Sequence, residues 1–137
     1  MKKQIFIFIL FVAVLLAGCQ TKSVTGETVA AVGGSYQNII PDELNTMLRD
    51  KDFVFVNVHI PFEGNIADTD LSIPYNEIEQ NLSQLPSDKN AKIVLYCRSG
   101  RMSVMAAESL VGLGFTNIWN LDGGMVEWEQ AGYALQE

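Results

Sequence analysis

The chain has 137 residues, a formal net charge of −7 and two cysteines. This length suits one domain and not two. The excess of acidic side chains argues against a protein that binds nucleic acid or an anionic membrane surface. The sequence shows no internal repeat.

The first eighteen residues have the pattern of a secretory signal. Lys2 and Lys3 precede an unbroken apolar run at 5–17, which is shorter than the roughly 20 residues that a membrane-spanning helix needs. The run ends in Leu16-Ala17-Gly18-Cys19, which resembles the lipobox of bacterial lipoproteins. The resemblance implies a signal peptide at 1–18, cleavage before Cys19 and attachment of a diacylglycerol to the Cys19 sulfur.

A lipidated Cys19 would place the protein outside the cytoplasm, anchored to the cell membrane or the outer membrane. One acyl chain binds a bilayer only marginally, and several chains make a durable anchor. Cleavage would remove two of the nine basic residues and none of the sixteen acidic ones, which leaves seven basic residues and a net charge of −9. It would also leave Cys97 as the single free thiol, an oxidisable group whose presence in an exported protein favours a catalytic role.

The remaining chain divides into a tether and a domain. Residues 19–35 are polar, lack apolar periodicity and contain Gly33-Gly34, so we expect a flexible tether. From residue 36, apolar patterns typical of strands alternate with patterns typical of helices. In chain order, the expected elements are a strand at 36–39, a helix at 41–48, strands at 53–58 and 71–73, a helix at 77–85, a strand at 93–96, a helix at 103–113, a strand at 117–121 and a helix at 125–131.

This alternation predicts an α/β domain with a parallel five-stranded sheet and helices on both faces. Ligand sites in such sheets lie at the carboxyl ends of the strands. Three segments are expected there: residues 57–59, the loop after Tyr96, and residues 122–124.

The loop after Tyr96 contains the pattern with the clearest chemistry, Cys97-Arg98-Ser99-Gly100-Arg101-Met102. It joins a buried strand to a helix expected to begin near Ser103. The backbone amides of such a turn and of the following first helical turn form a cradle for an anion. Gly100 permits backbone angles that other residues avoid, and Arg98 and Arg101 add positive potential. A thiol in this setting is expected to ionise readily and to act as a nucleophile.

These residues resemble the active-site loop of the rhodanese family, Cys-Arg-x-Gly-x-x before a helix. Cys97, Arg98 and Gly100 match that loop position by position, and Gly123-Gly124-Met125-x-x-Trp128 matches the family's closing Gly-Gly-x-x-x-Trp signature. The resemblance spans roughly 36–135, within a rhodanese-like domain placed at 36–137.

The resemblance implies a sulfurtransferase. Cys97 would take the outer sulfur of a donor such as thiosulfate and hold it as a persulfide, which a thiophilic acceptor would then remove. The persulfide would be bound by residues 98–102, which are Arg98, Ser99, Gly100, Arg101 and Met102. This chemistry needs no metal and no organic cofactor. The implied partners are a small sulfur-containing anion, a thiol acceptor or an acceptor protein, and we expect a monomer.

The chain departs from the family near the site. Rhodanese domains commonly carry Asp-x-Arg after the central strand and a Gly-His-Ile beyond it. Here these positions read Asn57-Val58-His59 and Gly64-Asn65-Ile66. His59 is the single histidine, and with one free cysteine it does not make a metal site. The departures keep open a second hypothesis, a weakly catalytic or non-catalytic module that carries a persulfide or binds a partner.

Two other functions fit the sequence less well. Tyrosine and dual-specificity phosphatases use Cys-x5-Arg, in which the arginine clamps phosphate, but the corresponding residue here is Ser103. A thiol-disulfide oxidoreductase of the Cys-x-x-Cys type needs a second thiol where this chain has Gly100.

The lipobox resemblance makes a direct prediction. Replacing Cys19 with Ser should abolish incorporation of labelled fatty acid into the protein expressed in bacteria, because a hydroxyl does not replace the modified sulfur. Cys97→Ser, which leaves the lipobox intact, should incorporate label like the wild type. Absence of label from the wild-type protein would show that the signal has been misread.

Overall fold

The structure is a computed structural model that describes residues 23–137. The predicted signal peptide at 1–18 and the lipidation site Cys19 lie outside the described residues. Within residues 23–137, no helix combines the length and the apolar character needed to cross a membrane.

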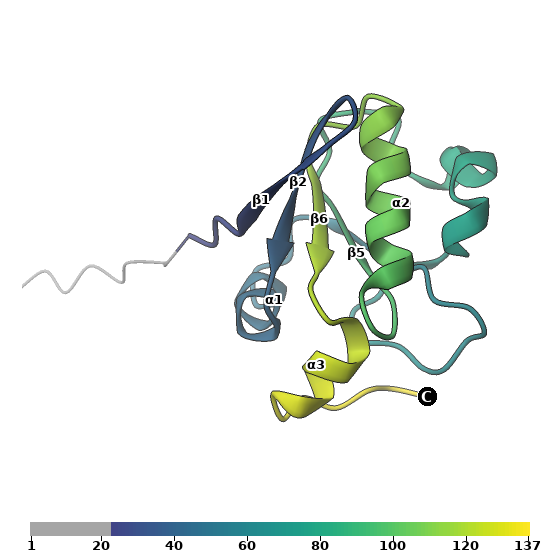
Figure 1. The fold of residues 1–137 in the computed structure, drawn as a ribbon. Helices are drawn as coiled ribbons and strands as arrows, with labels where there is room; N and C mark the ends of the chain where they lie inside the picture. The colour runs from purple at the N-terminus through teal and green to yellow at the C-terminus, as the bar shows by residue number, and fades with distance from the viewer. Residues whose placement is uncertain (1–22) are drawn as a thin grey trace, which may run out of the picture.

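The described chain forms a six-stranded sheet flanked by helices (Figure 1). The strands follow the order β1-β2-β6-β5-β3-β4 across the sheet. All neighbouring strands pair in parallel except β1 and β2, which form an antiparallel hairpin at one edge. The elements in chain order are β1 (Glu27–Ala31), β2 (Gly34–Ile39), α1 (Pro41–Leu48), β3 (Val54–Asn57), β4 (Leu71–Ser72), the 3-10 segments η1 (Tyr75–Glu77) and η2 (Glu79–Gln84), β5 (Ile93–Tyr96), α2 (Arg101–Gly112), β6 (Ile118–Leu121) and α3 (Gly124–Gln130).

The predicted α/β fold is therefore confirmed, with one strand more than expected. The prediction of a flexible tether reaching residue 35 is wrong from Glu27 onward, because Glu27–Ala31 pairs with β2 along its whole length. Backbone hydrogen bonds to β2 hold this edge strand, and only Val29 and Ala31 pack on the core. A polar edge strand stabilised mainly by its partner leaves little apolar periodicity to detect.

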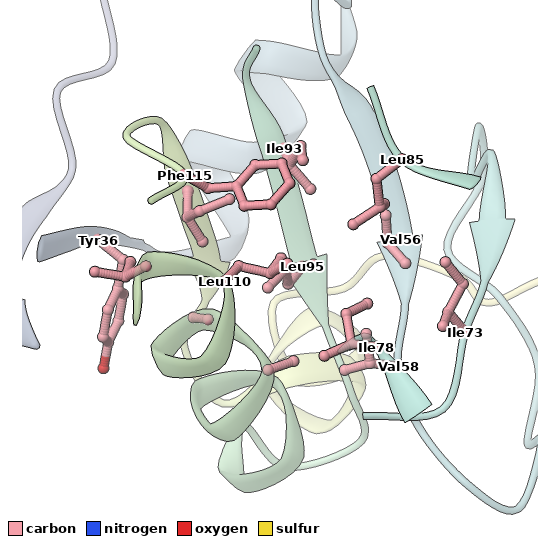
Figure 2. Packing of buried hydrophobic residues seen from close by; sticks show 14 of the residues in the cluster. Tyr36, Val56, Val58, Ile73, Ile78, Leu85, Ile93, Leu95, Leu110 and Phe115 are labelled. Atoms are coloured by element: carbon pink, nitrogen blue, oxygen red, sulfur yellow. The ribbon is translucent and has the colours of Figure 1, made fainter. Parts of the chain in front are cut away.

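Helical segments cover both faces of the sheet. One face packs against α2, η1 and η2 around residues that include Val56, Ile78 and Leu110, as Figure 2 shows. The other face packs against α1 and α3 through side chains that include Leu44, Met125 and Trp128. β5 and β6 lie between other strands and contribute side chains to both clusters.

Two helices differ from the sequence prediction. The helix expected at 77–85 is instead a pair of 3-10 segments, and Asn81 inside the second has non-helical backbone angles of φ −113° and ψ 21°. The helix expected from 103 begins two residues earlier, at Arg101, because Gly100 adopts a φ of +99° and ends the preceding loop. The loop after β5 is therefore four residues long, from Cys97 to Gly100.

A buried tyrosine joins the end of β5 to the segment that follows β3. The Tyr96 hydroxyl accepts a hydrogen bond from the Ile66 N–H at 3.0 Å and donates one to Asn65 Oδ1 at 3.1 Å. It also lies 2.7 Å from Thr69 Oγ1. Burial raises the pKa of Tyr96 above its usual 10.0, and the hydrogen bonds from Thr69 and Ile66 partly oppose that rise.

α3 approaches the loop after β5 at backbone contact distance. The Met125 N–H donates to the Cys97 carbonyl and the Val126 N–H to the Arg98 carbonyl, both at 2.9 Å. Gly124 makes this approach possible, because a Cβ on it would lie 2.3 Å from the Cys97 carbonyl oxygen and 2.8 Å from the Arg98 carbonyl group. Its φ of +57° also favours glycine.

Removing the Tyr96 hydroxyl should destabilise the domain. Tyr96→Phe leaves the buried Ile66 N–H without a partner, and we expect the free energy of unfolding to fall by about 1–3 kcal/mol in urea titrations at pH 7. Folding raises the pKa of Tyr96 above 10. The protonated hydroxyl therefore makes its full contribution to the free energy of unfolding below pH 10, and this contribution falls as the pH rises above 10. The difference between wild type and variant should therefore shrink above pH 10, and a constant difference would contradict this reading.

Gly124→Ala should destabilise the domain more than a matched glycine substitution. Gly132 also has a positive φ, +94°, but a Cβ there would meet no atom within 4 Å. We expect Gly132→Ala to cost about 1–2 kcal/mol of unfolding free energy from backbone conformation alone, and Gly124→Ala a further 1–3 kcal/mol or so from overlap with the loop backbone. Equal losses would show that the close approach of α3 contributes nothing.

Candidate functional site

The site forms where the loop after β5 turns into α2. Cys97 directly follows β5, and its residue surface is 1% exposed. Its Sγ accepts a hydrogen bond from the Gly100 N–H at 3.0 Å and lies 3.4 Å from the Ser103 hydroxyl. Both neighbours come from the start of the helix, so the sulfur faces the N-terminal end of α2.

This end of α2 has the properties of an anion cradle. The N–H groups in the first turn of a helix have no carbonyl partner within that helix, and the helix dipole adds positive potential there. α2 is twelve residues long and begins at Arg101. The Gly100 amide already points at the sulfur. Cys97 also belongs to the apolar cluster beneath α2, so the Gly100 amide and the start of α2 are the polar groups that a thiolate or persulfide would meet there.

The predicted binding residues differ in their exposure to solvent. Arg98, Ser99 and Arg101 are exposed, Gly100 is buried and Met102 is half-buried against the core. Arg98 Nη1 lies 3.5 Å from Glu63 Oε2. No carboxylate among residues 23–137 forms an ion pair with Arg101.

Ser103 is a site residue that the sequence reasoning treated only as the missing arginine of a phosphatase. It is fully buried, and its hydroxyl donates to the Gly100 carbonyl at 3.1 Å while touching Cys97 Sγ. Ser103 thereby ties the loop to the first turn of the helix. In the sequence, Ser103 could have been recognised as a polar residue at a helix position that faces the core, where its neighbours are apolar.

The residues that depart from the family pattern form one network beside Cys97. Asn57 is buried, and its Nδ2 donates to Asn65 Oδ1 and to the Gly64 carbonyl, each at 3.0 Å. Asn57 Oδ1 accepts from the His59 N–H at 2.9 Å. The His59 ring contacts Glu63, the carboxylate that also pairs with Arg98. Neutral amides thus organise this loop, and Glu63 was not singled out from the sequence.

The three segments expected at the carboxyl edge of the sheet do meet there. Asn57 of β3 is opposite Tyr96 of β5, and the turn at Gly123–Gly124 packs on the loop that begins at Cys97. Within residues 23–137, no group of three or more His, Cys, Asp or Glu side chains is arranged to bind a metal ion.

Comparisons with known proteins point to one family. A family model described as a rhodanese-like domain matches residues 41–131. A sulfurtransferase of Allochromatium vinosum is 34% identical over 98 residues, which covers 69% of this chain and 89% of the relative. A tRNA uridine(34) hydroxylase of Hamiltonella defensa is 30% identical over 92 residues, which covers 63% of this chain but only 26% of that protein.

A solved structure agrees with the sequence comparisons. The rhodanese-related protein from Thermoplasma volcanium superposes with a TM-score of 0.62 and 30% sequence identity, covering 73% of this chain and 97% of that one. The matched family model includes β3, β5, α2 and α3, the elements that surround Cys97. The chain therefore belongs to the rhodanese-like family.

Proposed function

We propose that this protein is a sulfurtransferase that moves a sulfane sulfur from a donor such as thiosulfate to a thiophilic acceptor through a persulfide on Cys97. The observation that carries the proposal is the position of Cys97 Sγ, 3.0 Å from the Gly100 amide at the start of α2. Membership in the rhodanese-like family and the similarity to a sulfurtransferase support the reaction class.

The first half-reaction transfers sulfur to the enzyme. The Cys97 thiolate attacks the outer sulfur of thiosulfate and forms a new S–S bond. The original S–S bond breaks, and sulfite leaves with its electron pair. The product on Cys97 is a persulfide, whose terminal sulfur carries the negative charge and accepts hydrogen bonds from the helix start.

The second half-reaction returns the thiolate. An acceptor such as cyanide attacks the terminal sulfur, the S–S bond to Cys97 breaks, and thiocyanate leaves. The total charge is unchanged in each step, and neither step requires an external oxidant or reductant. The residues proposed to bind the persulfide are Arg98, Ser99, Gly100, Arg101 and Met102.

A phosphatase reaction is a poorer fit to this geometry. A phosphate-clamping arginine is needed at position 103, where the side chain is a fully buried serine hydroxyl. A second candidate is a persulfide carrier that releases sulfur only to a specific acceptor protein. The neutral Asn57 and Asn65, which occupy positions where the family commonly has Asp and His, favour that alternative.

The cellular setting is part of the proposal. The lipobox at Leu16-Ala17-Gly18-Cys19 supports a lipid-anchored protein that acts outside the cytoplasm. We propose that it acts as a monomer. Its partners would be a small sulfur-containing anion, a thiol acceptor or an acceptor protein, and the acidic charge argues against nucleic acid.

Cys97→Ser should abolish sulfur transfer. The wild-type site is best tested in the full chain carrying Cys19→Ser, where Cys97 is the sole thiol. With thiosulfate, this protein should gain the mass of one sulfur atom and lose it when cyanide is added, with formation of thiocyanate. With Cys97→Ser added, both the adduct and thiocyanate should disappear, because a hydroxyl is a far weaker nucleophile.

Other outcomes of the same mass measurement discriminate between the functions. A thiol that gains no sulfur from thiosulfate or a polysulfide would contradict sulfur transfer. A persulfide that forms but is not released to cyanide or a small thiol would favour the carrier. Cys97-dependent hydrolysis of aryl phosphates would contradict both the sulfurtransferase and the carrier and would indicate a phosphatase.

A further inference from the structure

A carboxylate lies beside Arg98, the exposed residue that follows the buried Cys97. The pair of Glu63 and Arg98 is here called the entrance to the cradle. Glu63 Oε2 is 3.5 Å from Arg98 Nη1 and 2.5 Å from His59 Nε2. The Glu63 and Arg98 side chains are 41% and 48% exposed, whereas the His59 side chain is only 8% exposed. One oxygen of Glu63 therefore joins a largely buried ring to an arginine that reaches into solvent.

The loop that carries Glu63 is held on both sides. On the N-terminal side, the His59 N–H donates to the buried Asn57 side chain. On the C-terminal side, Asn57 binds the Gly64 carbonyl and Asn65 Oδ1, and Asn65 forms backbone hydrogen bonds with Gln136 in both directions at 2.7 Å. These contacts hold the backbone at His59 and at 64–65, on either side of Glu63.

The pairing changes the charge that a sulfur donor meets. Half-exposed ion pairs contribute little to stability, but a carboxylate that contacts a guanidinium cancels most of its potential at a distance. Arg98 directly follows Cys97, so its charge would otherwise help to attract anions to the sulfur. With Arg98 paired, the cationic side chain near Cys97 that no carboxylate within residues 23–137 pairs with is Arg101, at the start of α2.

We propose that Glu63 determines which sulfur donors this site accepts, by neutralising Arg98 and favouring donors of low negative charge, such as an alkyl persulfide, over a small dianion such as thiosulfate. The inference rests on the proposed sulfurtransferase function and refines its donor class.

The preferred reaction balances without any further reactant. The Cys97 thiolate attacks the outer sulfur of R–S–SH and forms the enzyme persulfide, and the original S–S bond breaks so that the alkyl thiolate leaves with its electron pair. An alkyl persulfide carries at most one negative charge, on its terminal sulfur, whereas thiosulfate carries two. A dianion gains twice as much per unit of potential as a monoanion, so a carboxylate at the entrance discriminates by charge.

The first test measures charge selectivity without any sulfur transfer. In the full chain with Cys19→Ser, Cys97 is alkylated at pH 8 and low salt by anionic iodoacetate and by neutral iodoacetamide. Glu63→Gln should raise the ratio of the iodoacetate rate constant to the iodoacetamide rate constant about three- to tenfold, as expected for one negative charge removed nearby. Glu63→Asp should keep the wild-type ratio, and 1 M salt should largely remove the effect of Glu63→Gln.

A matched control removes the same charge far from the site. Glu27 is exposed on β1, three strands from β5 in the sheet and thus about 14 Å away at the usual strand spacing. Glu27→Gln should change the alkylation ratio less than twofold. The ratio cancels any change in the intrinsic reactivity of the thiol, which a merely structural effect of Glu63→Gln would alter for both reagents.

The second test uses the donors themselves. Glu63→Gln should raise kcat/KM for the dianion thiosulfate about tenfold, mainly through KM, and raise kcat/KM for a monoanionic alkyl persulfide only about threefold. An unchanged alkylation ratio, or equal changes for both donors, would overturn the role of Glu63. If no donor transfers sulfur to Cys97, the proposed function fails, and the donor-class proposal fails with it even if the alkylation ratio responds to Glu63.

Discussion

The geometry of this protein depends on a contact between two backbones, where α3 begins against the loop that starts at Cys97. Two amides of α3 donate to the Cys97 and Arg98 carbonyls, and a side chain at Gly124 would overlap those same groups. While α3 holds both loop carbonyls, the Gly100 amide of the same loop donates to the sulfur. Gly124 is thus a steric requirement of the contact between α3 and the loop.

A second constraint joins the cradle to the loop after β3. Tyr96 precedes Cys97, and its hydroxyl binds Asn65 and Ile66, while Asn57 binds Asn65 from the neighbouring strand. Buried polar groups are costly unless they are paired, so these side chains hold one arrangement together. The entrance to the site is therefore as well defined as the cradle, although its residues differ from the common family pattern.

Together, the two constraints place the groups that contact the Cys97 thiol and the groups proposed to select the sulfur donor in different parts of the site. The Gly100 amide at the helix start contacts the sulfur itself, whereas Glu63 and Arg98 are proposed to act on the charge of the donor that approaches it. Amide donors are neutral dipoles whose influence is short-ranged, and charged side chains act over a screening length of about 8 Å at physiological salt. Changes at the entrance can therefore alter donor preference while leaving the nucleophile intact.

The sequence by itself determined the family, the α/β class and the position of Cys97 between a buried strand and a helix, because apolar periodicity and glycine placement are local properties. It did not reveal β1, in which only Val29 and Ala31 face the core and whose order comes from pairing with β2. Nor did it reveal the contact of Ser103 with the sulfur or the pairing of Glu63 with Arg98, residues 35 positions apart. The contact between Ser103 and the sulfur depends on the turn at Gly100, whose φ of +99° brings the start of α2 back onto Cys97. The pairing of Glu63 with Arg98 exists only because β3 and β5 lie side by side in the sheet and bring the loops at their carboxyl ends together.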